Sequence, residues 1–470
     1  MTLPLALSQN TVNLVYAAAA ILLILGIKRL SSPATARSGN LVAAAGMALA
    51  VGITLFSPGL DRYWLIAAGI AFGSVIGFAS ARMVRMTAIP QMVALFNGVG
   101  GGAAALIAAA EFHRLAPEPG GLAGDILAGI MFSALIGSIS FSGSLVAFAK
   151  LQELLPGRPL TFPAQQVFNG LLFAATLAAA VAAAAAEEQV WMVALLVGAL
   201  VFGVMLVLPI GGADMPVVIS FLNAFTGLAA ASTGFVLDNV ALIIGGTLVG
   251  ASGTLLTVLM GRAMNRSLAN VLFGAFGAAP SGGGAGGAAT ADGQMVREIT
   301  AEDAAVMLAY ASQVMVVPGY GLAVAQAQHA TRELADLLEA RGVRVKYAIH
   351  PVAGRMPGHM NVLLAEASVP YPQLMDMEDA NPELGRTDVA LVVGANDVTN
   401  PAARSNPESP LYGMPILDVD SAANVIVLKR SMSPGFAGID NELYSNPKTA
   451  MLFGDAKASV ERLVAGVKAV

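Results

Sequence analysis

The chain of 470 residues contains no cysteine and few charged residues. Without cysteine it can form no disulfide, hold no thiolate-bound metal and use no cysteine nucleophile, although this absence does not identify a compartment. Charged residues make up 12% of the chain, roughly half of what a soluble domain carries. The formal net charge is -5, so no basic surface can neutralise phosphates, which argues against a nucleic-acid partner.

The few charges are unevenly distributed. Most of them lie after Arg266, although that part of the chain is the shorter one. Before it, from Val12 to Met260, the residues form about nine apolar stretches, each close to the roughly 20 residues that cross a bilayer. These stretches lie at roughly 12–27, 39–56, 63–80, 88–110, 122–149, 164–186, 189–208, 214–234 and 239–260. The sequence therefore predicts an α-helical polytopic membrane domain over residues 1–266.

The loops between the stretches predict an orientation. One set of alternate loops carries almost all of the basic residues of this part: Lys28, Arg29, Arg37, Arg82, Arg85, Lys150, Arg158, Arg262 and Arg266. The other set carries only Arg62 and Arg114, beside several acids. Because basic loops stay in the cytoplasm, we expect the N-terminus outside and everything after Met260 inside.

The remaining residues divide into a linker and a second domain. Residues 267–296 are rich in Gly and Ala, as in the run Gly277–Gly293, and such composition predicts a flexible linker. Residues 297–470 then alternate between short apolar strands and helices. We predict strands at Gln313–Pro318, Val343–Ile349, Asp388–Val393, Asn424–Leu428 and Ala450–Phe453. This alternation indicates a Rossmann-like, doubly wound parallel sheet.

A glycine motif follows the first of these strands, in the segment Val316–Gln328. A strand, a Gly-x-Gly turn and a helix are the arrangement that binds a pyrophosphate. Gly319 permits the tight turn and Gly321 lets the backbone approach a phosphate, but Val324 occupies the third small position of the strict motif. A simple tight turn is the alternative.

The end of the second strand lacks the acid that holds the ribose of NAD. The strand ends at His350, which favours NADP(H), because an acid would repel its 2′-phosphate. The strand Asn424–Leu428 is followed by Lys429, Arg430 and Ser431. These residues offer two cations and a hydroxyl, which suit a phosphate monoester. A solvated basic loop is the alternative.

Two further loops follow predicted strands, where open sheets bind ligands. They are Gly354-Arg355-Met356-Pro357, ahead of a helix, and Gly394-Ala395-Asn396-Asp397. Ordinary turn chemistry explains either loop equally well.

Polar side chains within the apolar stretches are candidates for a proton path. Asp214 lies at the edge of one stretch, and Asn97 and Asn223 lie inside others. Such groups either line a water path or simply form hydrogen bonds between helices.

Together these motifs resemble the proton-translocating NAD(P) transhydrogenases. The resemblance covers nearly the whole chain and rests on segments in the same order: GGADMPVVIS, RAMNRS, GYGLAVAQAQ, GRMPGHMNVLLAEA, LVVGAND, NPAA, NVIVLKRSM and MLFGDAKASV. The layout is that of a beta subunit, which lacks the NAD(H)-binding domain carried by the alpha subunit.

The resemblance implies an oxidoreductase and translocase that transfers hydride from NADH on the alpha subunit to NADP+ on this chain, coupled to inward proton movement. We therefore expect a multi-pass protein of the bacterial inner membrane, assembled as a dimer of alpha–beta units in the lipid bilayer, with no metal site. The nucleotide of this family is bound in a flipped orientation, which weakens the inference from His350.

Individual residues match the motifs of the family. Asp397 matches an acid beside the nicotinamide, taken as the catalytic position, and Lys429, Arg430 and Ser431 match contacts to the 2′-phosphate. The implied cofactor-binding set is Gly319, Tyr320, Gly321, Ala323, Val324, Gly354, Arg355, Met356, Pro357, Gly394, Ala395, Asn396, Asp397, Lys429, Arg430, Ser431, Gly454 and Asp455. The implied proton path is Asn97, Asp214, Asn223 and Ser252.

Two positions depart from the family. Asn97 stands where many members have a histidine, and Asn does not titrate near neutral pH. We therefore expect a titrating histidine from a helix of the partner, and a partner without an intramembrane histidine would contradict this. Phe436 stands where relatives often have tyrosine, so a phenolic contact to the nucleotide is lost.

Two other functions fit parts of the sequence. An ion channel or transporter with a regulatory dinucleotide-sensing domain is one, although a T-V-G-Y-G-like filter within the apolar part is absent and Gly319-Tyr320-Gly321 lies beyond the linker. A membrane anchor for a dehydrogenase domain is the other, but it would not need Asn97, Asp214 or Asn223.

Overall fold

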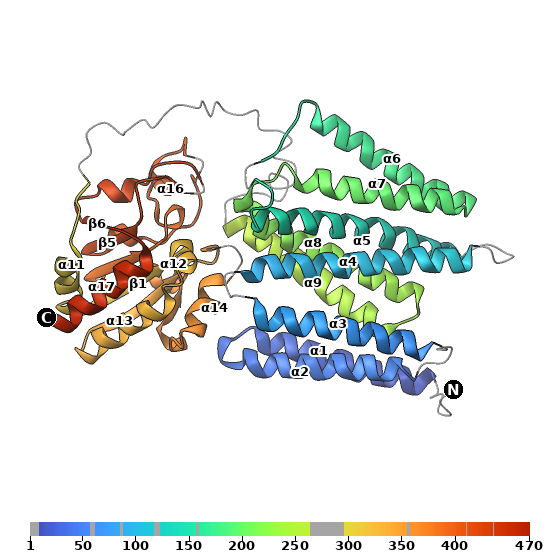
Figure 1. Ribbon diagram of the computed structural model, residues 1–470, viewed down its shortest axis with the longest axis horizontal. Coiled ribbons are helices and arrows are strands. Elements are labelled where there is room, and N and C mark those ends of the chain that lie inside the picture. Colours follow the sequence, from blue (N-terminus) through green and yellow to red (C-terminus); the bar gives the residue numbers. More distant parts are fainter. Residues whose placement is uncertain are drawn as a thin grey trace. The chain divides into compact units, whose positions relative to one another are not determined.

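The computed structural model describes residues 9–56, 62–84, 88–116, 123–156, 159–263, 296–354, 358–409, 411–435 and 437–470. The chain forms two compact units, Met1–Thr257 and Val258–Val470. Figure 1 shows that the first is built of helices and that the second contains the sheet. Apart from Val296, the predicted linker 267–296 lies outside the described residues, so its flexibility and the predicted domain boundaries remain predictions.

Nine helices in the described part of the chain are long and apolar enough to cross a membrane, as the sequence predicts. They are α1 (Gln9–Leu30), α2 (Pro33–Thr54), α3 (Tyr63–Met83), α4 (Ile89–Leu115), α5 (Gly124–Leu151), α6 (Gln165–Ala186), α7 (Gln189–Val207), α8 (Met215–Val236) and α9 (Val240–Ala263). The predicted start of α2 is six residues late, because the fixed φ of Pro33 suits the first turn of a helix.

Large apolar side chains on these helices face outward. No described residue of α3 is buried, and its Trp64 and Phe72 are 70% and 71% exposed. Apolar surface of this extent is costly in water and favourable against lipid tails. The protein is therefore a membrane protein.

Small residues let the helices of this unit approach closely. Helix α5 packs against α4, α7 and α8. A Cβ on Gly137 of α5 would lie 2.6 Å from the carbonyl oxygen of Gly101 of α4, and one on Gly227 of α8 would lie 2.5 Å from the amide nitrogen of Gly250 of α9. Such contacts replace the hydrophobic effect, which does not drive helix association in lipid.

The second unit contains a six-stranded parallel sheet. Its strands are β1 (Gln313–Pro318), β2 (Arg344–Ile349), β3 (Leu374–Asp376), β4 (Val389–Val393), β5 (Asn424–Lys429) and β6 (Thr449–Phe453). Their order is β3-β2-β1-β4-β5-β6, and each neighbouring pair is parallel. The order in which strands are added to the sheet reverses between β1 and β4, which confirms the predicted doubly wound fold.

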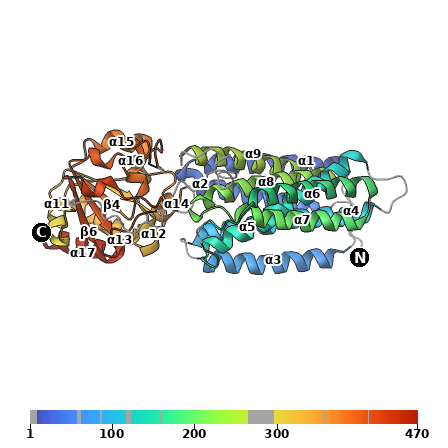
Figure 2. The ribbon, with the colours of Figure 1, turned by 90° about the horizontal axis from the view of Figure 1, so that it is seen from above.

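Helices cover both faces of this sheet. Figure 2 shows α15 and α16 on one side of the strands and α13 and α17 on the other. The helices are α11 (Ala301–Ala309), α12 (Tyr320–Ala325), α13 (Gln328–Ala340), α14 (His359–Glu366), α15 (Met377–Leu384), α16 (Ala402–Ser405) and α17 (Ala456–Ala469). Every residue of β1 and β4 is buried, as expected for strands covered on both faces.

Two local predictions were wrong. Strand β3 is absent from the predicted set, because three residues give no recognisable pattern. The single helix predicted after the glycine motif is two helices, α12 and α13, because Gln326 adopts a left-handed conformation with φ of 52° and ends α12.

Substitution of Gly246 in α9 should destabilise the helical unit. A Cβ on Gly246 would collide with the backbone of Ala231 in α8, whereas one on Gly245 meets nothing within 4 Å. We expect Gly246→Val to cost about 1–3 kcal/mol through overpacking, and Gly245→Val to serve as the matched control. Thermal unfolding in detergent measures the difference, and equal midpoints for the two variants would contradict the packing of α8 on α9.

Candidate functional site

The loops after β1 and β4 meet through their backbones. The amide of Gly319 donates to the carbonyl of Val393 at 2.9 Å, and the amide of Gly321 donates to that of Gly394 at 2.9 Å. A Cβ on Gly319 would collide with the backbone of Ala395, and one on Gly321 would lie 2.7 Å from the Cα of Gly394. Glycine is therefore required at the point between β1 and β4 where the strand order reverses. Open α/β sheets bind ligands at this point.

The loop after β4 is bonded to residues of the segment 437–444. The Oδ1 of Asn396 accepts hydrogen bonds from the hydroxyl of Tyr444 at 2.7 Å and from Nδ2 of Asn441 at 3.0 Å. Asn441 Nδ2 also donates to the backbone oxygen of Asn396 at 3.0 Å. The Oδ2 of Asp397 accepts from the amide of Ala437 at 3.0 Å. These bonds hold Asn396 and Asp397 beside the segment that follows β5.

Lys429 brings a cation to the same place. Its ammonium donates to the carbonyl of Ser433 and lies 4.7 Å from the centre of the Tyr444 ring. Burial lowers the pKa of Lys429, and the carboxylates of Asp397 and Asp440 act in the opposite direction. Lys429 is thus half-buried between an aromatic face and acidic groups, which suits a group that meets an anionic ligand.

Arg430 and Ser431 continue from Lys429 and are exposed. The Ser431 hydroxyl lies 3.0 Å from that of Ser433. Both residues are therefore accessible to a ligand at the carboxyl end of β5.

The loop after β6 lies next to Lys429. The amide of Gly454 donates to the carbonyl of Lys429 at 3.0 Å. The carboxylate of Asp455 caps α17, accepting from the amides of Lys457 at 3.1 Å and Ala458 at 3.3 Å. Asp455 therefore has a structural role, and its contact with a cofactor remains a prediction.

The other predicted cofactor residues differ in accessibility. Tyr320 begins α12 and is half-buried, Ala323 is buried, and Val324 is exposed. Gly354 has φ of 107° and packs on His359. The predicted contacts Arg355, Met356 and Pro357, and the departure at Phe436, lie outside the described residues.

His350 at the end of β2 is occupied by internal contacts. Its Nε2 is 2.9 Å from the carbonyl of Pro415, and its Nδ1 accepts from the amide of Val352 at 3.3 Å. Since Nδ1 accepts, the proton belongs on Nε2, and burial lowers the pKa of His350 and favours this neutral form. Both ring nitrogens are therefore used within the fold, so His350 is poorly suited to hold a phosphate.

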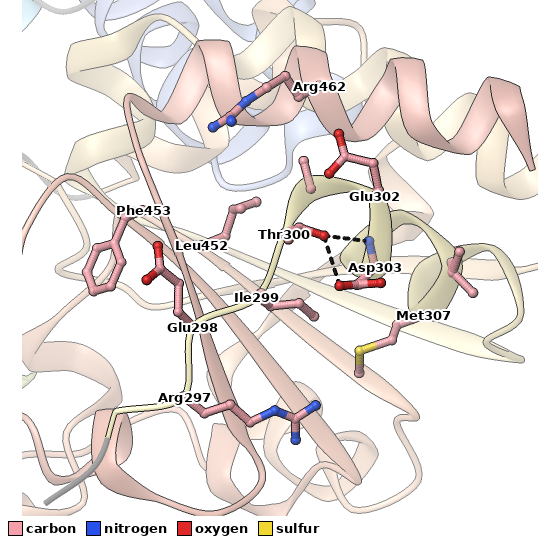
Figure 3. A pocket seen from close by; sticks show the side chains of 12 residues that line it. Arg297, Glu298, Ile299, Thr300, Glu302, Asp303, Met307, Leu452, Phe453 and Arg462 are labelled. Atoms are coloured by element: carbon pink, nitrogen blue, oxygen red, sulfur yellow. Dashed lines mark hydrogen bonds between the residues drawn. The ribbon is translucent and has the colours of Figure 1, made fainter.

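A separate groove of about 990 Å³ lies at the β6 edge of the sheet. Figure 3 shows side chains of both charges around it, among them Arg297, Glu302 and Arg462. Thr300 caps α11 by accepting from the amide of Asp303 at 3.1 Å. None of the described residues that line the groove belongs to the predicted cofactor set. Its mixed charge and its place away from β1 and β4 make it a poorer dinucleotide site than the glycine loops.

A buried polar cluster joins three helices of the first unit. Asn97 of α4 donates from Nδ2 to the hydroxyls of Ser144 at 2.9 Å and Ser140 at 3.4 Å, both on α5. Ser140 lies 2.6 Å from the hydroxyl of Thr226 on α8. The Oδ1 of Asn97 is buried and has no hydrogen-bond partner among the described residues. A buried, unsatisfied oxygen of this kind offers a place for a water molecule.

The structure does not gather all four predicted proton-path residues into this cluster. Only Asn97 belongs to it. Asp214 forms part of the short helix η2 (Gly212–Asp214) before α8, Asn223 is half-buried on α8, and Ser252 is on an exposed position of α9, bonded to Val249 of its own helix. Their place in a proton path remains a prediction.

Sequence reasoning missed several residues of both sites. Ser140 and Ser144 are spaced i, i+4, so they share a helix face, and this signal was available in the sequence. Thr226, Asn441 and Tyr444 reach their sites from distant segments, and no local pattern marks them.

Residues 12–466 match the family described as NAD(P) transhydrogenase beta subunit. The chain is 50% identical over 455 residues to the NAD(P) transhydrogenase subunit beta of Rhodospirillum rubrum, covering 96% of this chain and 97% of that protein. A second sequence, from a defined strain of the same species, is similar to the same extent.

Substitution of Gly319 tests the contact between the two loops. Gly319→Ala places a Cβ against the backbone of Ala395, which has no flexible end that could move aside. We expect the sheet unit to lose about 1–3 kcal/mol of stability. Gly385→Ala is the matched control, because its nearest neighbour is 3.9 Å away and its φ is -65°. Calorimetry of the purified chain measures both, and a Gly319→Ala protein as stable as the control would contradict the contact.

Proposed function

Because the chain belongs to the NAD(P) transhydrogenase beta subunit family, we propose that it binds NADP(H) at the carboxyl ends of β1, β4 and β5 and couples hydride transfer to proton movement across the membrane. The family name implies oxidoreductase activity and a partner alpha subunit. In the proposed reaction, NADH on that partner reduces NADP+ on this chain. The observation that carries the proposal is that a cation, Lys429, lies beside the glycine loop after β4: the amide of Gly394 donates to the carbonyl of Leu428 at 3.3 Å, and Asp397 of that loop acts on the Lys429 ammonium.

The glycine loops fit a dinucleotide. Gly321 and Gly394 are half-buried, and a side chain at either position would fill the space in which their backbones meet. Backbone without side chains, at the point where the strand order reverses, allows a pyrophosphate to approach closely. The residues present therefore fit the cofactor that the family implies.

The charged groups divide the site into two ends. Lys429, Arg430 and Ser431 supply cations and a hydroxyl suited to a 2′-phosphate. Asp397, on the neighbouring loop, supplies the negative charge of the nicotinamide end and holds Ala437 through its carboxylate.

Hydride chemistry belongs to the nicotinamide ring, and the protein supplies orientation and electrostatics. Asn396 and Asp397 hold the loop after β5 in place, so the two ends of the site keep a fixed separation. Direct hydride transfer from the partner's nucleotide then requires only that the nicotinamide end of the site face the partner.

In the membrane unit, we propose that the cluster of Asn97, Ser140, Ser144 and Thr226 conducts protons through bound water. Since none of these groups titrates near neutral pH, the titrating histidine would come from a helix of the partner subunit. The positive-inside rule supports an outer N-terminus and a cytoplasmic NADP(H) unit, and a pair of alpha–beta units is the proposed assembly.

Removal of Lys429 should weaken NADPH binding selectively. Loss of one charge-assisted hydrogen bond costs about 1.5–3 kcal/mol, so we expect Lys429→Ala to raise the NADPH Kd about tenfold to a hundredfold. The change for NADH should be much smaller, because it lacks the 2′-phosphate. Titration calorimetry with both nucleotides measures the effect.

Lys457→Ala is the control for this experiment, since Lys457 is exposed and pairs with Glu461 at the surface. Its nucleotide affinities should equal those of the wild type. Equal losses of NADPH and NADH binding in Lys429→Ala would rule out the assignment of the phosphate end.

Replacement of Asn97 should uncouple the two processes. Asn97→Leu removes the donor to Ser140 and Ser144 and the buried Oδ1, so we expect proton uptake into vesicles to fall at least about tenfold while NADPH affinity is unchanged. The measurement uses the chain reconstituted with its partner.

Thr247→Val is the matched control, because its exposed hydroxyl donates to the carbonyl of Ile243 in its own helix at 2.6 Å. Proton uptake by Asn97→Leu at the rate of this control would remove Asn97 from the path.

A further inference from the structure

Tyr444 connects the two ends of the proposed nucleotide site. The residue is 3% exposed. Its hydroxyl donates to Oδ1 of Asn396 on the loop after β4, and its ring faces the ammonium of Lys429 at the end of β5. One side chain thus contacts the residue beside Asp397 and the cation assigned to the phosphate end.

The aromatic face restricts where the Lys429 ammonium lies. A lysine side chain has four rotatable bonds, and its ammonium lacks the rigid, planar arrangement of donors that orients an arginine guanidinium. The ring of Tyr444 on one side and the carbonyl of Ser433 on the other attract the ammonium to one position. A cation held in advance loses less conformational entropy when an anion binds.

Hydrogen bonds fix the ring itself. The Oδ1 of Asn396 accepts hydrogen bonds from the Tyr444 hydroxyl and from Nδ2 of Asn441. Asn441 Nδ2 also donates to the backbone oxygen of Asn396. Burial raises the pKa of Tyr444, and the nearby Asp397 carboxylate raises it further, so the phenol stays protonated and continues to donate. Packing in the core holds the ring beside Lys429 together with this bond.

We propose that Tyr444 is a positioning residue that sets the preference for a 2′-phosphorylated nucleotide by holding the Lys429 ammonium against its ring. This inference rests on the proposed function, because it assumes that Lys429 meets the 2′-phosphate. Tyr444 does not touch the ligand in this role and acts through Lys429.

The alternative is that Tyr444 only fills the core, where it packs with Leu443 and Val419. The two roles differ in what they change. A core residue affects the affinity for NADPH and NADH equally, whereas a residue that positions Lys429 affects their ratio and has no effect on that ratio once Lys429 is absent.

The test measures the Kd of NADPH and NADH for the full chain in detergent. Tyr444→Phe keeps the ring, which core packing holds in place without the hydroxyl, and should keep the wild-type ratio of the Kd of NADH to the Kd of NADPH. Tyr444→Leu removes the ring and should lower that ratio about threefold to thirtyfold. In a Lys429→Ala background, Tyr444→Leu should leave the ratio unchanged. A ratio that Tyr444→Leu does not alter, or alters equally in both backgrounds, overturns the proposal.

A second series keeps the shape of the ring, so that folding is not at issue. Phenylalanine with one, two or three ring fluorines at position 444 weakens the negative face of the ring progressively. The NADPH preference should fall in the same order, and an unchanged preference across the series overturns the proposal. If the wild-type chain itself shows no preference for NADPH, the proposed function fails instead, and the two results are thus distinguishable.

Discussion

The direct backbone contact between the loops after β1 and β4 is the constraint on which the rest of the site depends. Gly319, Gly321 and Gly394 carry no side chain where the two loops meet, so the amides of one loop bond the carbonyls of the other. This contact fixes Asn396 and Asp397 at the same edge as Lys429, since β5 is the neighbour of β4. A larger residue at Gly319 would separate the loops and with them the two charged ends of the site.

Both units use glycine to bring backbone segments into contact, but the helical unit does so in lipid and the sheet unit in water. In the helical unit, glycines such as Gly227 and Gly246 bring backbones together because lipid offers no hydrophobic drive between helices. In the sheet unit, buried strands supply that drive, and Gly319, Gly321 and Gly394 allow close approach at the strand ends. Each unit carries polar groups where it is proposed to act, at the Asn97 cluster and around Lys429.

Much of this could be predicted from the sequence, because apolar runs and strand–helix alternation are local patterns. The nine membrane helices, the parallel sheet and the position of the Gly319 turn follow from them. Strand β3 and the break at Gln326 do not, since three residues show no period and no local pattern marks Gln326 as the left-handed residue that ends α12. The roles of Tyr444 and Thr226 could not be predicted for another reason, because each depends on contacts with distant segments of the chain.

The most direct test of the account is a structure of the full chain with NADPH bound, determined by electron cryomicroscopy with its partner present. The account predicts that the nucleotide lies along Gly319, Gly321 and Gly394 with its 2′-phosphate within hydrogen-bonding distance of Lys429. A nucleotide in the groove beside Arg297 and Arg462, with Lys429 still held by Ser433 and Tyr444 and far from any phosphate, would contradict it.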